Sequence, residues 1–380
     1  MAITAAHARP DPVFPIDENA PSLKILDLAR WAPSGDNEQP WRFEDVSDLK
    51  FKVVIGPHAP GNPYEYADGR PVWFAGGTLL ESIDLAAKRL GYKATIEHDG
   101  QKTCLANRQL RFQVHLAADP NLPTDKLAQF LKTRTVDRSA YSTRRLTSRE
   151  KAHLQMSLPE GYRLTFRETL ADRWKMALLN SRSTVLRLHL SSTYPVHKRV
   201  LKFGEPAPVS GLAVETVPMD PMSRHFMKWA LGTQKRFRLI NKNLGGARLA
   251  AVQTDFVPGI RCGAHFLMTS SKAFSQDPLD AIAAGRAIMR FWLTAESLGL
   301  SVQPGFAPLC FGHNATSNPT EFKADELTQA NFLRNDLSKI CDDLDKLTFI
   351  GRIGEPKRRD TKFRSFRRPL SELIEPGTAN

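Results

Sequence analysis

The sequence predicts an α+β protein made of two related halves. Short segments with alternating or continuous apolar residues, typical of strands, are interleaved with longer helical patterns. Two of the helical segments, 76–94 and 284–302, resemble each other without a gap. With 380 residues, of which 41% are hydrophobic, the chain is long enough to bury a core in each half.

The first half is predicted at 21–125, after a polar, Pro-rich and mobile N-terminal arm at 1–20. Apolar residues at helical spacing and a Gly that ends the second helix predict helices, and alternating residues predict strands. The expected elements are a helix at 21–31, strands at 41–46 and 49–56, a helix at 75–90, and strands at 93–97 and 110–116.

The second half is predicted at 126–380, and it contains a helical insertion at about 185–250 that could form a lid. The same criteria apply as in the first half. The expected elements are helices near 124–133 and 147–156, a strand at 162–168, helical pieces over 170–250, a strand at 263–270, a helix at 278–299, a strand and turn at 301–306, a helix at 323–345 and a strand at 347–353.

The two similar helices predict an internal two-fold interface. Gly77 aligns with Gly285 and Gly91 with Gly299, at a constant offset of 208 residues. Small residues at equivalent places let two helix backbones approach each other. An amphipathic helix that ends in Leu-Gly also gives some similarity by itself.

The segment APSGDNEQPWRF, at 32–43, is the most informative stretch for chemistry. Pro33 and Gly35 favour an irregular backbone whose amide groups stay available, and Ser34 and Asn37 add short polar side chains. Such a loop can present hydrogen-bonding groups to a flat polar heterocycle. The residue types alone also fit an ordinary turn between a helix and a strand.

This loop resembles the flavin-contacting loop of the nitroreductase family, which consists of FMN-dependent NAD(P)H oxidoreductases. Three further segments resemble family elements: the dimer-interface helix with its following flavin loop at 285–306, a phosphate-binding element in RTVDRSAY at 134–141, and the terminal FRRPLSELI at 366–374. The resemblance covers most of the chain. Val136 stands where the family has Ser, so one hydrogen bond to the cofactor is expected to be missing.

The resemblance implies a nitroreductase-like fold in which two fused halves form a pseudo-two-fold internal dimer. Family dimers bind FMN between subunits, one giving the loop and the other the arginines. Here the loop at 32–43 lies in the first half, whereas the arginine segments at 134–138 and 366–369 lie in the second. A single FMN site is therefore expected, on a monomer or a loose homodimer.

The resemblance also implies the contacts of the cofactor. Guanidinium groups bind a phosphate well, and backbone groups near the flavin ring stabilise its reduced form. Arg134 and Arg138 are four positions apart, so a short helical turn would place them on one side. The implied cofactor-binding residues are Pro33, Ser34, Gly35, Asn37, Arg134, Arg138, Gln303, Pro304, Gly305, Arg367 and Arg368.

The implied activity is two-electron transfer from NAD(P)H through FMN to a nitroaromatic, a quinone or another conjugated acceptor, with no catalytic side chain required. Three alternatives stay open: a protein that stores FMN without turnover, a flavin dehydrogenase or oxidase acting on a biosynthetic intermediate, and a basic interaction protein that has lost the cofactor. The sequence has no GxGxxG, P-loop or GxSxG motif and no metal-binding His or Cys pattern, so we expect no metal.

The charge of the chain and its lack of a visible secretory signal bear on its partners and location. The net charge is +13, with basic stretches at 224–248 and 352–368. A helix around Phe226 and Trp229 fits a membrane interface or a partner, but a core-packed helix with a wet basic face is favoured, without specific nucleic-acid or membrane contact. The four cysteines are scattered and no secretory signal is visible, which favours a cytoplasmic location with Cys262, Cys310 and Cys341 in the core.

Overall fold

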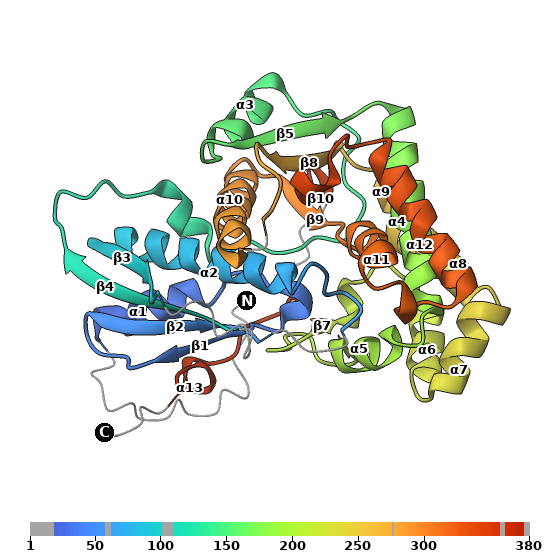
Figure 1. Cartoon of the computed structure of the whole chain (residues 1–380), viewed down its shortest axis with the longest axis horizontal. Coiled ribbons are helices and arrows are strands. Elements are labelled where there is room, and N and C mark those ends of the chain that lie inside the picture. Colours follow the sequence, from blue (N-terminus) through green and yellow to red (C-terminus); the bar gives the residue numbers. More distant parts are fainter. Residues whose placement is uncertain (1–18, 58–61, 101–108, 276, 358–361, 376–380) are drawn as a thin grey trace.

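A computed structural model shows a mixed α+β protein with two antiparallel four-stranded sheets (Figure 1). Most of the predicted N-terminal arm lies outside the residues that the structure describes. The described residues are 19–57, 62–100, 109–275, 277–357 and 362–375.

The first sheet belongs to the first half and has the strand order β1-β2-β4-β3. Its strands alternate between buried apolar residues and more exposed residues. In β4, Leu110, Phe112 and Val114 are buried, and the residues between them are more exposed. Its strands are β1 (Trp41–Glu44), β2 (Lys50–Ile55), β3 (Tyr92–His98) and β4 (Leu110–Ala118).

The second sheet belongs to the second half and has the order β5-β8-β10-β9. Its central strand β10 is buried at every position, as expected for a strand covered on both faces. Its main strands are β5 (Tyr162–Arg167), β8 (Ala264–Ser270), β9 (Ser301–Pro304) and β10 (Leu347–Gly354).

Two long helices, α2 (Arg70–Arg89) and α10 (Pro278–Ser297), pack against each other between the sheets (Figure 1). Both bounds of α10 lie 208 positions after those of α2. A Cβ atom built on either Gly77 or Gly285 would lie 2.8 Å from the Cα atom of the other glycine. The small residues therefore allow the backbone contact that the sequence predicted.

An ion-pair network also joins the two long helices. The buried carboxylate of Glu81 on α2 accepts from Arg286 Nε at 2.8 Å and from Arg290 Nη1 at 2.9 Å, both on α10. Arg290 also binds Asp125 at 3.1 Å. The network fixes the register of α2 on α10.

The chain crosses between the two sheets twice. After β4, Val136 forms a parallel bridge with Val302 of β9, in the second sheet. After β10, the chain returns and Ile374 forms a parallel bridge with Phe43 of β1, in the first sheet. The segment that follows each sheet therefore forms a single β-bridge with a strand of the other sheet.

Helices occupy the chain between β5 and β8, and this helical region extends beyond the predicted 185–250 on both sides. In the first half only residues 45–49 separate the corresponding strands β1 and β2. Its helices and small strands are α4 (Leu170–His189), α5 (Thr193–Val200), β6 (Leu201–Lys202), β7 (Leu212–Ala213), η3 (Val214–Thr216), α6 (Pro221–Ala230), α7 (Gln234–Arg238), η4 (Leu239–Asn243), α8 (Gly246–Ala251), η5 (Val252–Phe256) and α9 (Val257–Ile260).

The remaining elements are helices that flank the sheets or follow β9. The predicted helix near 124–133 is only a 3-10 helix, and two helices, α11 and the short α13, have no counterpart among the predictions. These elements are α1 (Pro21–Ala29), η1 (Gly35–Asn37), η2 (Lys126–Phe130), α3 (Ser148–Met156), α11 (Ala307–Ser317), η6 (Pro319–Glu321), α12 (Ala324–Ser338), η7 (Leu344–Lys346) and α13 (Leu370–Leu373).

Burial confirms some sequence expectations and overturns one. Cys262, Cys310 and Cys341 are buried, as predicted for core residues, and Cys104 lies outside the described residues. On α6, Phe226 is 53% and Trp229 is 44% exposed. The expectation of a core-packed helix is wrong for these two side chains, because α6 lies at the edge of the helical region (Figure 1).

The described residues form neither a candidate membrane-crossing helix nor a candidate metal site. No helix among them combines the length and apolar character that a bilayer-crossing helix needs. Nor do they contain a group of three or more His, Cys, Asp or Glu side chains arranged to hold a metal ion.

The buried His265 predicts a loss of stability in acid. Burial lowers the pKa of His265 to about 4, although its Nε2 atom lies 2.8 Å from the carbonyl oxygen of Gly259. The unfolded chain takes up this proton below about pH 6.5, and the folded chain does so only below about pH 4. The free energy of unfolding should therefore fall as pH drops through this window.

Urea unfolding between pH 7 and pH 4 measures this effect. His265→Gln should reduce the pH slope by up to about 1.4 kcal/mol per pH unit, which corresponds to one proton. His225→Gln, at an exposed position on α6, is the matched control. An unchanged slope in His265→Gln would show that another group controls the acid limb.

Candidate functional site

The predicted flavin loop connects α1 to β1 and has an unusual backbone. Asp36, Asn37 and Gln39 have positive φ angles of 51°, 58° and 53°. Non-glycine residues adopt this left-handed region infrequently, and such residues cluster at functional sites. The loop is fastened internally because Ser34 Oγ accepts from the Gln39 amide at 2.9 Å. Thr78 of α2 donates to the carbonyl oxygen of Pro33 at 2.9 Å.

Two remote segments cover this loop. Asn37 Nδ2 donates to the carbonyl oxygen of Phe366 at 2.9 Å, and Gln39 Oε1 accepts from the Arg368 amide at 2.8 Å. Gln39 Nε2 also donates to the carbonyl oxygen of Val209 at 2.9 Å. We call residues 205–211 the cover segment. The C-terminal segment 362–368 pairs with it, since the Phe366 amide donates to the Pro208 carbonyl at 2.8 Å.

Gln39 holds these three parts together, although it was not among the predicted cofactor-binding residues. It is fully buried and its side chain bonds the loop, the cover segment and the C-terminal segment. The sequence signal that could have pointed to Gln39 is its place in the motif, two residues before the buried Trp41. The bonds themselves depend on chain segments that are far away in sequence.

Replacing Gln39 by Leu should release the cover segment and the C-terminal segment. The variant leaves the Val209 carbonyl and the Arg368 amide without this partner, which costs about 1–3 kcal/mol for each buried group. Hydrogen exchange should speed up in 203–213 and 362–368 and stay unchanged in β8 and β10. Unchanged exchange in 203–213 would show that other contacts hold the cover segment.

Four arginines surround Trp31 at the start of the loop. Arg134 and Arg367 both donate through Nη2 to the Trp31 carbonyl oxygen at 3.2 Å, and the Arg364 guanidinium lies 4.8 Å from the Trp31 ring. With Arg30, whose guanidinium lies 5.9 Å from the same ring, they form what we call the Trp31 arginine cluster. Segments from both ends of the chain therefore meet here.

The charges of the Trp31 arginine cluster are poorly compensated. Burial, together with the charge of Arg364, lowers the pKa of Arg134 to about 9. Burial and the charges of Arg134 and Arg364 also lower the pKa of Arg367. The four positive guanidinium groups are opposed by two carboxylates. Asp27 forms an ion pair with Arg30 at 2.7 Å, and the negative charge of Glu296 acts on Arg134 and Arg364. A bound anion would relieve this excess.

The structure separates Arg138 from Arg134. Residues 134–138 are not helical, because Val136 lies in extended backbone that bridges to β9. The expectation of a helical turn is therefore wrong. Arg138 Nη1 contacts Thr216 Oγ1 at 3.5 Å, and its carbonyl oxygen accepts from Arg352 at 2.7 Å. Arg138 and Arg352 thus form a second cationic group, separate from the Trp31 arginine cluster.

The predicted flavin segment 303–305, which is the end of β9 and the turn after it, lies beside Arg352 in this second group. Gln303 Oε1 accepts from Arg352 Nε at 2.7 Å, and Pro304 pairs with Gly351 at the end of the strand. The Gly305 amide donates to the Ile350 carbonyl at 2.8 Å. A Cβ atom on Gly305 would lie 3.0 Å from Asn180 Oδ1 of α4, so this turn lies close to the helical region.

A polar group that the sequence analysis did not assemble lies on the other side of the loop. Tyr64 Oη and His197 Nε2 are 3.1 Å apart, and burial and the charge of Arg187 lower the pKa of His197 to about 3. Burial also raises the pKa of Asp36, against the nearby charges of Arg187 and Arg138. We call Asp36, Tyr64, Arg187 and His197 the interior polar cluster.

These four side chains are partly exposed, and burial is the main cause of the pKa shifts of Asp36, Tyr64 and His197. Arg187 Nε is buried without a hydrogen-bond partner. Such a combination is typical of groups that await a ligand. Arg187 and His197 give no signal in the sequence.

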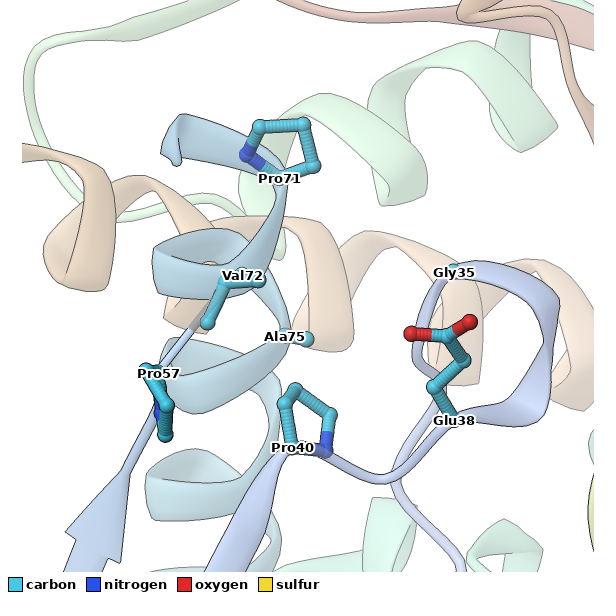
Figure 2. A pocket seen from close by; sticks show the side chains of 7 residues that line it. All are labelled: Gly35, Glu38, Pro40, Pro57, Pro71, Val72 and Ala75. Atoms are coloured by element: carbon cyan, nitrogen blue, oxygen red, sulfur yellow. The ribbon is translucent and has the colours of Figure 1, made fainter. Parts of the chain in front are cut away.

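A small cavity of about 30 Å³ lies between the loop and the start of α2 (Figure 2). Figure 2 shows the Glu38 carboxylate in the space between the loop and α2. This volume suits one or two water molecules and is far too small for a flavin ring. The lining residues are Gly35, Glu38, Pro40, Pro57, Pro71, Val72 and Ala75.

Comparison with known families and with curated proteins finds no match for this chain.

Proposed function

We propose that this protein is an FMN-dependent oxidoreductase of the nitroreductase type, with one cofactor site between two fused halves. The observation that carries the proposal is the meeting of three segments remote in sequence. The loop at 33–40 contacts the C-terminal segment through Asn37, and the preceding carbonyl of Trp31 accepts from both Arg134 and Arg367. These are the segments that the motif resemblance assigned to one cofactor.

The arrangement of the halves supports an internal pseudo-dimer. Both sheets have the same strand order when β1, β2, β3 and β4 are matched with β5, β8, β9 and β10. A Cβ atom on Gly77 would overlap the Ile282 carbonyl oxygen, and one on Gly285 would overlap the Phe74 carbonyl oxygen. These two contacts are related by the same 208-residue offset, as a two-fold axis between the helices requires.

The Trp31 arginine cluster fits the phosphate of FMN. Arg134 Nε is buried and has no hydrogen-bond partner, so a donor is available for an anion. Arg368 Nε, outside this cluster, is also buried without a partner. Arg134 and Arg367 would hold the phosphate, because planar guanidinium groups bond phosphate oxygens in pairs. Arg138 would instead serve the polar edge of the ring, since it lies in the second cationic group with Arg352.

FMN, when bound, would supply hydride chemistry with NAD(P)H as donor and a nitroaromatic, quinone or other conjugated compound as acceptor. The residues of this chain would bind, orient and shield it. Asn37 and Gln39 hold the cover segment over the loop, which excludes water. Arg138 and Arg187 would favour negative charge on the ring or on the acceptor.

Anaerobic mixing of FMN-loaded protein with NADPH or NADH tests this function. The visible flavin absorbance should bleach, and addition of a quinone or nitroaromatic should restore it. A loaded protein that stays oxidised with both nucleotides would refute the oxidoreductase assignment.

FMN storage is a second candidate, favoured by the cover segment. Residues 205–211 and 362–368 bond to each other and to the loop, so they would shield a cofactor from a nucleotide. In that case the loaded protein would stay oxidised, and Gln39→Leu would allow it to bleach. An oxidoreductase would bleach without this substitution.

A further inference from the structure

Helix α6 leaves an apolar face uncovered at the edge of the molecule. Met222, Phe226 and Trp229 are spaced by four and three residues, which places them on one helix face, and they are 69%, 53% and 44% exposed. Of the ten residues of α6, all of them described, only Ala230 is buried. We call Met222, Phe226 and Trp229, with the adjacent Lys228 and Arg236, the α6 face.

The helix is attached at its two ends, and not through the exposed Met222, Phe226 and Trp229. Gln253 donates to the Asp220 carboxylate at 2.7 Å at the start of α6, and Tyr194 donates to the Leu231 carbonyl at 3.0 Å after its end. The exposed side chains are therefore not required for this attachment. The fold presents them outward.

The charge along this stretch is positive, apart from the Asp220 carboxylate at the start of α6. From Pro221 to Val252 the sequence has seven Lys or Arg residues and no Asp or Glu. Lys228, Lys235, Arg236 and Arg238 are exposed, and the Arg236 guanidinium lies 4.9 Å from the Trp229 ring. Further large apolar side chains in the same stretch are exposed, namely Leu239, Leu244, Leu249 and Val252.

We propose that the α6 face binds the surface of an anionic lipid bilayer. Exposed Trp, Phe and Leu beside Lys and Arg are the composition of helices that lie in the membrane interface. Aromatic side chains prefer the level of the headgroups, and lysine and arginine are attracted by anionic lipids. A second copy of the chain fits this face poorly, because both surfaces would carry the same positive charge.

Cosedimentation of the full chain with vesicles tests the proposal. Vesicles of phosphatidylcholine with phosphatidylserine should bind the protein, and pure phosphatidylcholine vesicles should bind it about tenfold or more weakly. Phe226→Ser with Trp229→Ser should lower the affinity about tenfold or more. Phe332→Ser is the matched control, because Phe332 is 59% exposed on α12, which has acidic residues in its first turn.

Charge reversal and depth measurements complete the test. Lys228→Glu with Arg236→Glu should reduce binding about a hundredfold, whereas Lys93→Glu with Arg163→Glu, two exposed positions on β3 and β5, should reduce it far less. Brominated lipids should quench tryptophan fluorescence in the native protein and less in Trp229→Phe. Absence of vesicle binding at low salt would overturn the proposal. So would a dimer that Phe226→Ser with Trp229→Ser dissociates, or tighter binding to RNA than to vesicles.

Discussion

Replacing Gly77 by alanine should destabilise the protein by about 3 kcal/mol or more, because backbone atoms stand where the new methyl group would lie. The added Cβ would overlap the Ile282 carbonyl oxygen and lie 2.8 Å from the Gly285 Cα atom. Neither atom can move without separating α2 from α10. Since this helix pair joins the two sheets, urea unfolding should show a lower midpoint for the whole chain.

Gly76→Ala is the matched control for this substitution. Its Cβ would meet side-chain atoms of Ile55 at 2.6 Å and 2.7 Å, and a side chain can shift where a backbone cannot. The higher helix propensity of alanine, by about 1 kcal/mol, also offsets part of the cost. Equal losses in the two variants would contradict the backbone contact at Gly77 and the two-fold packing inferred from it.

The double substitution Arg134→Gln with Arg367→Gln, which removes two positive charges, should weaken FMN binding about a hundredfold or more. Each charged hydrogen bond to a phosphate contributes about 1.5–3 kcal/mol. Riboflavin, which lacks the phosphate, should bind the double variant as well as the native protein. Flavin fluorescence titrations with both ligands measure the difference.

The stability of the unliganded double variant separates a phosphate site from a structural role. The pKa of each arginine is lowered in the folded state, so the two charges are unfavourable there. Their removal offsets the loss of the hydrogen bonds to the Trp31 carbonyl oxygen, and the melting temperature should change little. Loss of FMN affinity together with an equal loss of riboflavin affinity would contradict the phosphate assignment.

Local patterns predicted the strands and the two central helices well. The strand expected at 93–97 occupies 92–98, and the helix expected at 278–299 occupies 278–297. In both segments the apolar period agrees with burial in the fold. The helix α11 was not predicted, because seven of its eleven residues are buried, five of them consecutive, and they leave no clear amphipathic pattern.

The candidate site could be predicted only where it follows a continuous motif. The irregular loop at 33–40 was predicted from its Pro, Gly and Asn, and it bonds to the C-terminal segment. Its role as a flavin loop stays a prediction. The interior polar cluster comes from three separate segments, so no spacing in the sequence connects Tyr64 with His197. The exposure of Trp229 was also not predictable, because an amphipathic helix has the same period whether its apolar face is covered or not.

Native mass spectrometry after incubation with FMN tests the shared cofactor site most directly. Our account predicts that a single chain of 42.5 kDa retains one FMN, since both contributing halves belong to the same chain. A chain that retains no FMN, or that retains it only when two chains associate, would contradict the account.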